Sequence, residues 1–382
     1  MKERVQFNRN EFSGSFGDIG TDFPLIVGMI LSANLDVASI FVMFGLMQIV
    51  TGFVYGLPMP MQPLKMMAVL VITKGIAAPV LFGAGIAIGL VMMVLTLSGA
   101  LNWLAKMIPA CVVRGIQFGL GLSLASLALR DYVPSAGYSG YLLALISFVV
   151  MLTLFGNRRW PPGIFVIGLG LLYAVFFKVD FNSFITGIEF RLPQIHSPKL
   201  SDIVTGFVIL ALPQLPLSIS NSVIATNKTI ADLFPERKIS VKKIGVTYSV
   251  INLIMPFFSG IPVCHGCGGL AGHYAFGART GGSVVIYGAM FMAIGLFFSQ
   301  GFTQVIEFLP KPILGIVLLF EALVLMFFIR DQASHKRDMA IALLVAVIAF
   351  TVPQGHVIGL LVGTGLYYFH KGFLSNNDSI VS

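Results

Sequence analysis

Charged residues are scarce in this sequence. They make up 10% of its 382 positions, whereas hydrophobic residues make up 57%. Soluble domains carry roughly 25% charged residues, so this shortage excludes an ordinary soluble protein. A mean hydropathy of +0.91 instead indicates a polytopic membrane protein. The 41 Gly and 19 Pro favour a bundle of closely packed and partly broken helices, because both residues are commoner in membrane helices than in soluble ones.

Cysteine is scarce as well. Cys111, Cys264 and Cys267 lie in apolar or Gly-rich surroundings and do not form the pattern of a disulfide-stabilised secreted protein. A cleavable signal peptide is not expected, because Met1 to Glu11 is polar and the next apolar run continues without a cleavage site. The net charge of +8 comes from scattered residues without a basic stripe, which argues against a nucleic-acid-binding protein.

Apolar runs of about 15 to 22 residues match a hydrocarbon layer about 30 Å thick and predict fourteen spans. The first seven are expected near residues 14–32, 37–56, 61–76, 79–98, 110–129, 139–156 and 161–178. The other seven are expected near residues 202–226, 242–259, 265–277, 282–299, 305–329, 338–352 and 355–371. The third span of each set is short and follows a Pro-containing break, which predicts a half-helix preceded by a short strand.

The two sets of spans resemble each other. Three prolines of the first set recur in the same order and at nearly constant separation in the second, pairing Pro24 with Pro216, Pro58 with Pro262 and Pro109 with Pro310. An odd number of spans per unit requires inverted copies. We therefore predict one inverted repeat over residues 1–200 and a second over residues 201–382, with a polar linker over 178–200.

The basic residues predict the orientation of the chain. Most of the 24 Lys and Arg fall on the side of the membrane that holds the N-terminus, and basic loops are typical of the cytoplasmic side. Both termini are therefore expected in the cytoplasm.

Two Gly- and Pro-rich stretches, residues 56–65 and 260–280, interrupt the apolar pattern at matching places. Interrupted backbone at membrane depth is tolerated only where it is buried in protein or lines a cavity, and a matched pair is typical of a transporter's substrate site. Gln62 is expected where the first half-helix starts, and such a start suits an anion. Lys65, one turn further in, is either a ligand or a counter-ion for a buried acid.

The second stretch contains Cys264, His265 and Cys267, with His273 beyond. A metal site is one reading, although a single Cys-x-x-Cys unit without a second cluster supports it weakly. Glycine backbone that forms an anion-binding nest is the other. His265 then either donates to the anion or packs as an ordinary buried histidine.

Polar residues recur elsewhere in the apolar runs. Gln214, Ser218 and Asn221 share one helix face, which indicates either interhelical hydrogen bonds or a substrate pocket. Asp18 and Asp22 lie one turn apart and are either functional acids or helix-terminal residues. Glu321 and Arg114 are interpreted as packing or gating charges.

Together these residues resemble the molybdate transporter family, a branch of the sulfate-permease superfamily without the usual regulatory domain. The resemblance rests on residues 16–24, 58–65, 214–225, 264–271 and 276–283. The chain departs from the family pattern at Asp22 and Cys267.

The resemblance implies an all-α fold of fourteen segments in two inverted repeats, like that of uracil permease and the anion exchangers. Spans 1–4 and 8–11 would form a core domain that carries the substrate. Spans 5–7 and 12–14 would form a gate domain, which also provides a dimer contact. The core would move against the gate as an elevator. The implied function is molybdate import without a cofactor and without enzymatic activity, with tungstate or sulfate as competitors.

We expect the dianion between the starts of half-helices 3 and 10, which together supply about +1 charge. The expected binding residues are Thr21, Gln62, Gln214, Ser218, Asn221, His265, Gly266, Cys267 and Gly268, with Asp18 and Lys65 for charge balance or proton coupling. Uniport is the alternative to H⁺ symport. The alternative functions are a sulfate or general oxyanion permease, a nucleobase carrier and a metal-dependent membrane redox protein.

Overall fold

The structure is a computed structural model that describes residues 5–157, 159–160, 162–177, 188–302, 306, 309–353 and 355–378. In the first half the elements are α1 Arg9–Gly14, α2 Ile19–Ala33, α3 Val37–Tyr55, β1 Gln62–Pro63, α4 Lys65–Lys74, α5 Ala78–Leu97, α6 Ala100–Met107, α7 Ala110–Leu127, η1 Ala128–Tyr132, η2 Val133–Ala136, α8 Gly137–Leu154 and α9 Pro162–Phe177. In the second half they are α11 Leu200–Gly206, η3 Phe207–Ala211, α12 Leu212–Leu217, η4 Ser218–Ala225, α13 Thr226–Leu233, α14 Val241–Ile254, η5 Met255–Phe258, β2 Val263–Cys264, α15 Cys267–Ala275, α16 Gly282–Phe297, α18 Lys311–Phe327, η6 Phe328–Gln332, α19 Lys336–Thr351 and α20 Gly355–Asp378.

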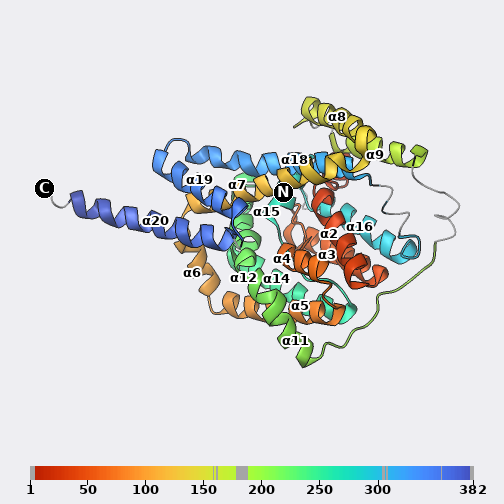
Figure 1. Cartoon of the computed structure of the whole chain (residues 1–382), viewed down its shortest axis with the longest axis horizontal. Coiled ribbons are helices and arrows are strands. Elements are labelled where there is room, and N and C mark those ends of the chain that lie inside the picture. Colours follow the sequence, from red (N-terminus) through yellow and green to blue (C-terminus); the bar gives the residue numbers. More distant parts are fainter. Residues whose placement is uncertain are drawn as a thin grey trace.

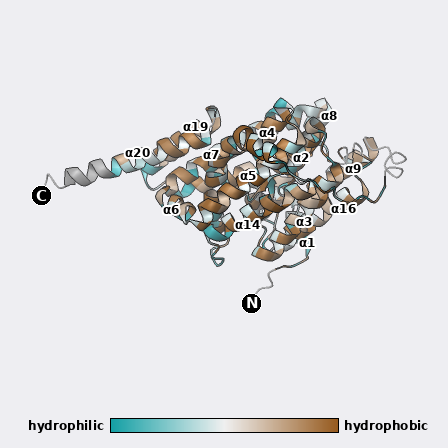
Figure 2. Cartoon of the chain, turned by 90° about the horizontal axis from the view of Figure 1, so that it is seen from below, coloured by the Kyte–Doolittle hydropathy of each residue, from teal (hydrophilic) through white to brown (hydrophobic). Residues whose placement is uncertain are grey.

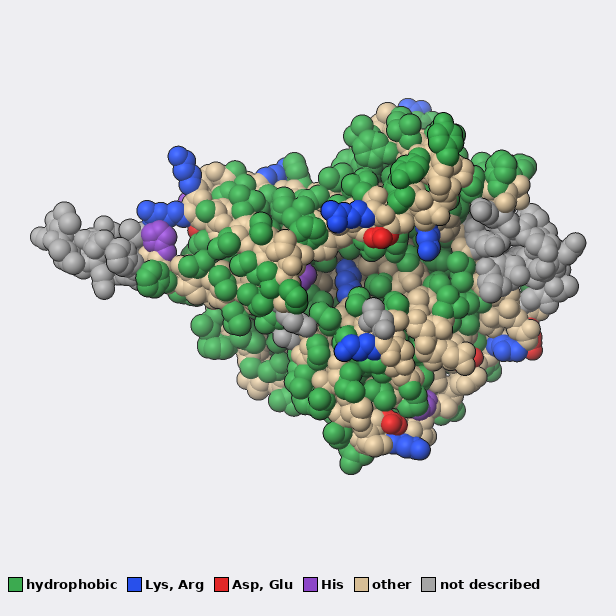
Figure 3. All heavy atoms as spheres, in the orientation of Figure 1, with side chains coloured by type: hydrophobic (Ala, Val, Ile, Leu, Met, Phe, Trp, Pro, Cys, Tyr) green, Lys and Arg blue, Asp and Glu red, His purple; other side chains and the backbone are tan. Residues whose placement is uncertain are grey.

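Several helical stretches can cross a membrane. Among the described residues, four are long and apolar enough by length and composition: Val37–Tyr55, Ala78–Leu97, Ala110–Leu154 and Lys311–Gln332. A fifth forms if Leu200–Leu215 and Ser218–Leu233, bent by 51°, count as one span. The prolines 213 and 216 lack a backbone N–H, which accounts for a break there. Hydrophobic residues dominate the helices and the visible face (Figures 2 and 3), as in a multi-pass membrane protein.

The helix boundaries correct two details of the sequence-based prediction. The half-helices begin at Lys65 and Cys267, later than the predicted 61 and 265, because the preceding prolines and glycines keep the backbone extended. Gln62 therefore lies in β1 and not at the start of α4, and Lys65 is the first residue of α4 and not one turn inside it.

Other boundaries also differ from the prediction. The eight-residue helix α6 was not predicted, because it is too short and too polar to register as an apolar run. α18 begins at Lys311 instead of 305, and residues 303–305 and 307–308 lie outside the described residues, as does 178–187 of the predicted linker.

The two predicted strands are present and meet in the middle of the bundle. β1 and β2 pair in antiparallel fashion, with Gln62 opposite Cys264 and Pro63 opposite Val263. Each strand leads directly into a half-helix, so that the pairing brings the starts of α4 and α15 together. Figure 1 shows α4 and α15 near the centre of the molecule, with α8 and α9 at its edge and α20 projecting from it.

Carboxamide side chains satisfy the extended backbone before each half-helix. Gln48 of α3 donates to Met61 O at 2.7 Å and accepts from Met61 N at 3.1 Å. Asn252 of α14 does the same for Val263, donating to its O at 2.7 Å and accepting from its N at 2.9 Å. Unpaired backbone groups are costly at membrane depth, so these two residues explain how the chain stays extended there.

Close helix pairs surround this crossing. α3 packs against α16, α5 against α14, and α7 against α18 and α19. Glycine permits the first of these contacts, since a Cβ at Gly45 would meet Gly288 O, and one at Gly288 would meet Gly45 O. Small residues at a helix interface let the backbones approach closely and pack by van der Waals contact.

Candidate functional site

The start of α15 is built from glycine. Its N-cap residue is Gly266, which has no side chain that could cap the first N–H groups. Gly266, Gly268 and Gly269 are all buried. An uncapped helix start presents unpaired N–H groups and about half a positive charge, so this backbone is suited to bind an anion.

Asp18 and Gln62 lie directly against these glycines. Gln62 Nε2 donates to Asp18 Oδ1 at 2.6 Å, and both side chains are fully buried. Asp18 Oδ2 and Gln62 Oε1 have no hydrogen-bond partner among the described residues. A Cβ on Gly266 would collide with Gln62 Oε1, and one on Gly269 would collide with Asp18 Oδ2. Glycine is therefore required at both positions. Asp18 is the N-cap residue of α2, but its side chain makes no cap hydrogen bond there.

Glu321 of α18 also reaches the start of α15, which the sequence-based interpretation missed. Thr21 Oγ1 donates to Glu321 Oε2 at 3.1 Å, and Glu321 Oε1, buried and without a partner in the described part of the chain, lies against the Cα of Gly268. The interpretation treated Glu321 as a packing or gating charge and not as a ligand. In the sequence Glu321 is recognisable as an isolated acid in an apolar run, but only the fold shows that its side chain faces α15.

A third carboxylate and one lysine complete the cluster. Tyr287 OH donates to Asp22 Oδ2 at 3.3 Å. The Lys65 ammonium is enclosed and has no hydrogen-bond partner within the described ranges, yet it interacts electrostatically with Asp18, Asp22 and Glu321. One lysine thus faces three buried acids.

The polar stripe of Gln214, Ser218 and Asn221 binds neighbouring elements. Gln214 Oε1 accepts from Met66 N in the first turn of α4 at 2.9 Å, and Gln214 Nε2 donates to Ser218 Oγ at 3.2 Å. Ser218 Oγ lies 2.8 Å from Tyr248 OH. All three stripe residues are buried beside the half-helices, so the predicted shared face exists and makes interhelical hydrogen bonds.

Asn221 connects the stripe to the second half-helix. The Cys267 thiol donates to Asn221 Oδ1 at 2.9 Å. A thiol is a weak donor, so this contact positions the start of α15 without holding it strongly.

The ring of His265 faces away from the start of α15. Its Nε2 lies 2.8 Å from Thr247 Oγ1 and its Nδ1 lies 3.1 Å from Pro60 O, and the ring packs edge-on against Tyr55. Both ring nitrogens have partners within the protein, which favours the packing alternative over donation to an anion by the ring. The backbone at His265 still leads into α15.

The residues of the metal alternative point in different directions. His273 Nδ1 lies 2.6 Å from Gly14 O, whereas Cys267 faces Asn221 and His265 faces Thr247. Within the described part of the chain, no group of three or more His, Cys, Asp and Glu is placed to hold a metal ion.

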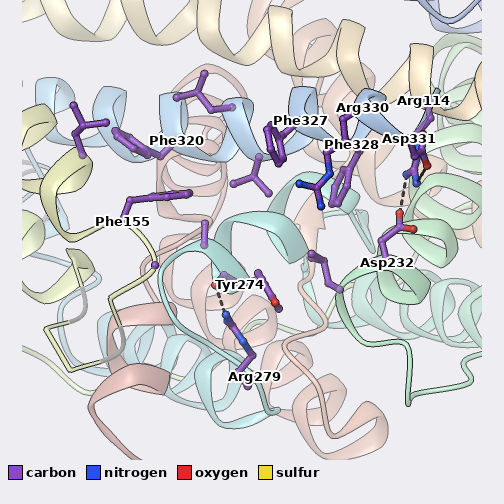
Figure 4. A pocket seen from close by; sticks show the side chains of 16 residues that line it. Arg114, Phe155, Asp232, Tyr274, Arg279, Phe320, Phe327, Phe328, Arg330 and Asp331 are labelled. Carbon is purple, nitrogen blue, oxygen red and sulfur yellow. Dashed lines mark hydrogen bonds and ion pairs between the residues drawn. The ribbon is translucent and has the colours of Figure 1, made fainter. Parts of the chain in front are cut away.

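A cavity of about 740 Å³ lies between α13 and the C-terminal end of α15 on one side and α8, α18 and η6 on the other. Figure 4 shows Phe320, Phe327 and Phe328 along one wall, Tyr274 and Arg279 on the facing wall, and Arg114 paired with Asp232 and Asp331 at one end.

Arg114 joins elements that are distant in the sequence. Its guanidinium lies 2.7 Å from Asp232 of α13 and 2.5 Å from Asp331 of η6, and it also donates to Gln117 at 3.0 Å. Its side chain is 3% exposed, and an unpaired buried charge would be costly. These contacts account for the predicted buried base.

Solved anion transporters share this arrangement of helices. The transmembrane domain of a cyanobacterial bicarbonate transporter, BicA, matches with a TM-score of 0.52 at 16% identity, covering 94% of this chain and 99% of that one. Murine Slc26a9, an anion transporter in the inward-facing state, matches with a TM-score of 0.62 at 14% identity, covering 97% of this chain and 70% of that one. The fold is therefore that of these membrane anion transporters.

Sequence comparison is more specific. The family described as "Molybdate transporter of MFS superfamily" matches residues 10–124 and 206–325. Molybdate transporter 2 of Arabidopsis thaliana is 32% identical, over 95% of this chain and 87% of the relative. Molybdate transporter 1 of Chlamydomonas reinhardtii is 25% identical, over 96% and 93%. The chain belongs to the molybdate transporter family, whose members named here are transporters and not enzymes.

Proposed function

We propose that this protein is a secondary active transporter that imports molybdate across the cytoplasmic membrane, with both termini in the cytoplasm. The observation that carries the proposal is the uncapped, glycine-built start of α15, which faces Gln62 and the start of α4. A tetrahedral dianion presents oxygen atoms that accept hydrogen bonds from such backbone N–H groups.

The proposed site lies between the starts of α4 and α15. Backbone near Gln62 and from His265 through Gly266 and Cys267 to Gly268 supplies donors. Further side chains contact the dianion or hold its binding backbone in position: Thr21, Gln214, Ser218 and Asn221. Lys65 and Asp18 balance the charge of the site. Because Gln214 and Ser218 already bond to their neighbours, their first task is to hold the start of α4 in position.

The proposed architecture is fourteen segments in two inverted repeats. Its support is the matching use of Gln48 and Asn252, one on the second and one on the ninth segment, to satisfy the strand before each half-helix. The packing of α3 on α16 and of α5 on α14 pairs the second segment with the eleventh and the fourth with the ninth, which is what a two-fold axis through the β1–β2 contact requires.

The proposed transport motion moves segments 1–4 and 8–11 as a core against segments 5–7 and 12–14 as a gate. The cavity has α13 and α15 of the core on one side and α8 and α18 of the gate on the other. It would be a path along which the substrate reaches the site. Figure 3 shows basic side chains around a hollow near the middle of one face, and positive charge at an entrance attracts anions. A homodimer through the gate is part of this proposal.

A sulfate or general oxyanion permease is the second candidate. Sulfate is also a tetrahedral dianion, and backbone N–H groups at a helix start bind either oxyanion. The size of the pocket then decides between molybdate, tungstate and sulfate.

The test is uptake and counterflow of molybdate by the full chain in proteoliposomes, together with calorimetric binding of molybdate, tungstate, sulfate and uracil. We expect saturable molybdate uptake that Gln62→Ala reduces at least about tenfold, since Gln62 holds Asp18 and adjoins Gly266. Gln300→Ala, at an exposed position, is the matched control and should transport normally. Equal affinity for sulfate would favour the general permease, and binding of uracil alone would refute both proposals.

A further inference from the structure

Two carboxylates from different helices lie beside the start of α15 in the proposed site. Asp18 Oδ2, from the start of α2, lies against Gly269, and Glu321 Oε1, from α18, lies against Gly268. Both oxygens are buried and have no hydrogen-bond partner in the described residues. They therefore place negative charge beside the first turn of α15 without accepting from its N–H groups, next to the place where the proposed oxyanion would bind.

The charges around Glu321 are unbalanced. Asp18 and Asp22 face it from α2, Lys65 from α4, Cys267 from α15 and Tyr287 from α16. Three ionised carboxylates and one ammonium leave a charge of −2, and the two helix starts offset about +1 of it. A dianion added to this cluster would bring the total to about −3 in a buried site, which is strongly unfavourable.

Glu321 is the carboxylate best placed to lose its charge. Asp18 accepts a hydrogen bond from Gln62 at 2.6 Å, Asp22 accepts one from Tyr287 at 3.3 Å, and Glu321 accepts one from Thr21 at 3.1 Å. Each acid also has a second oxygen without a hydrogen-bond partner in the described residues, and those of Asp18 and Glu321 lie against the first turn of α15. Of these two acids, Asp18 has the shorter hydrogen bond, which favours its ionised form more strongly, so Glu321 is the one that takes up a proton at its free oxygen.

We propose that Glu321 is a proton-binding residue of the substrate site, and that its ionised carboxylate and the dianion compete for the start of α15. This inference rests on the proposed function. A proton from the medium binds Oε1 of Glu321 to form an O–H group, which removes one negative charge and supplies a donor to a substrate oxygen. The dianion therefore binds with an accompanying proton, and release of the substrate returns that proton.

Competition of this kind fixes the sign of the pH dependence. Raising the pH ionises Glu321, so molybdate affinity falls as pH rises. If one proton is bound per dianion, the dissociation constant increases about tenfold per pH unit wherever free Glu321 is ionised. Substrate binding should also draw about one proton per molybdate from the buffer.

The experiment is calorimetric titration of the purified full chain with molybdate from about pH 6 to about pH 8.5, in buffers of different ionisation heat, which counts protons taken up. Wild-type protein should show the tenfold slope and the uptake of about one proton. Glu321→Gln keeps the size of the side chain and a hydrogen-bond acceptor for Thr21. It should reduce the slope to less than about twofold per unit, abolish the uptake, and bind more tightly than wild type at the highest pH.

Two variants serve as controls. Glu321→Asp retains a titratable carboxyl group and should keep the pH slope. Glu236→Gln makes the same chemical change at an exposed position and should behave as wild type.

Two results would overturn the inference. The first is molybdate binding by wild-type protein without proton uptake, which is informative even if Glu321→Gln does not fold. The second is an unchanged dependence of molybdate affinity on pH in folded Glu321→Gln. Failure of wild-type protein to bind molybdate at any pH would instead refute the proposed function.

Discussion

The starts of α4 and α15 meet across the β1–β2 contact, yet they are built differently. At α4 the first residue is Lys65, and Gln214 from another helix accepts from the N–H of Met66. At α15 the residues are glycine and cysteine, and the N-cap residue, Gly266, has no side chain that could cap the first turn. The start of α4 therefore offers side-chain groups, whereas the start of α15 offers backbone N–H groups.

This difference suggests a division of labour between the two half-helices. The start of α4 contributes a whole charge that does not depend on backbone geometry, whereas the start of α15 contributes N–H groups that only glycine can bring close to Asp18, Gln62 and Glu321. The comparison predicts that backbone space matters most at α15 and side-chain charge matters most at α4.

The largest effect is expected from Gly269→Ala. The added methyl group would collide with the Asp18 carboxylate and lie 2.9 Å from Gln62 Nε2, so the site must distort. Overpacking costs about 1–3 kcal/mol, and a molybdate affinity reduced about 100-fold is expected by calorimetry. Gly168→Ala is the matched control, because nothing lies within 4 Å of its Cβ position. Wild-type affinity in Gly269→Ala would show that α15 does not form the binding surface.

A smaller but clear effect is expected from Lys65→Met. This change removes the one ammonium among three buried acids while keeping much of the apolar side chain. We expect molybdate to bind about tenfold more weakly, because a unit charge near a dianion contributes at least this much at intermediate dielectric. Lys65→Arg retains the charge and should recover most of the affinity. If Lys65→Met and Lys65→Arg bind equally, the charge of Lys65 does not act on the ligand.

The smallest effect is expected from Cys267→Ala. Its side chain donates to Asn221 at 2.9 Å, but a thiol hydrogen bond is weak, and the backbone N–H at this position is unchanged. Molybdate affinity should change less than about threefold, and Cys111→Ala, far along the chain in α7, provides the comparison. A large loss in Cys267→Ala alone would mean that the α15 start binds through its side chain, and the division between the two half-helices would fail.

Much of the architecture could be predicted from local patterns. Apolar runs located α3, α5, α7 and α16 to within a few residues, because burial in a membrane requires continuous hydrophobic sequence. The prolines at 58 and 262 located the two strands. The exact starts of the half-helices were missed, since proline and glycine indicate an interruption but do not say where the helix resumes.

The candidate site was only partly predictable. Asp18, Gln62 and Lys65 were identified from their polarity in apolar surroundings, and they do lie together. Glu321 was identified as a buried acid and interpreted as a packing or gating charge, but its neighbours could not be predicted, because its contact with Thr21 spans 300 residues. For His265 the sequence left two roles open, donation to the anion or ordinary packing, and only the fold shows that its ring nitrogens lie close to Thr247 Oγ1 and Pro60 O. No local pattern predicts the direction of a side chain in an irregular segment.

The sequence by itself determined three properties of this chain. Its hydrophobicity shows that it is a membrane protein, its prolines and glycines show where the helices are interrupted, and its long motifs show the family to which it belongs. Only the tertiary structure decided which polar groups share the site. It brought Asp18 and Glu321 to the start of α15 and placed Asp22 and Lys65 in the same cluster of charges. The physical reason is that hydrophobic burial is encoded residue by residue, whereas the balance of buried charges depends on distances between segments that the chain brings together only when it folds.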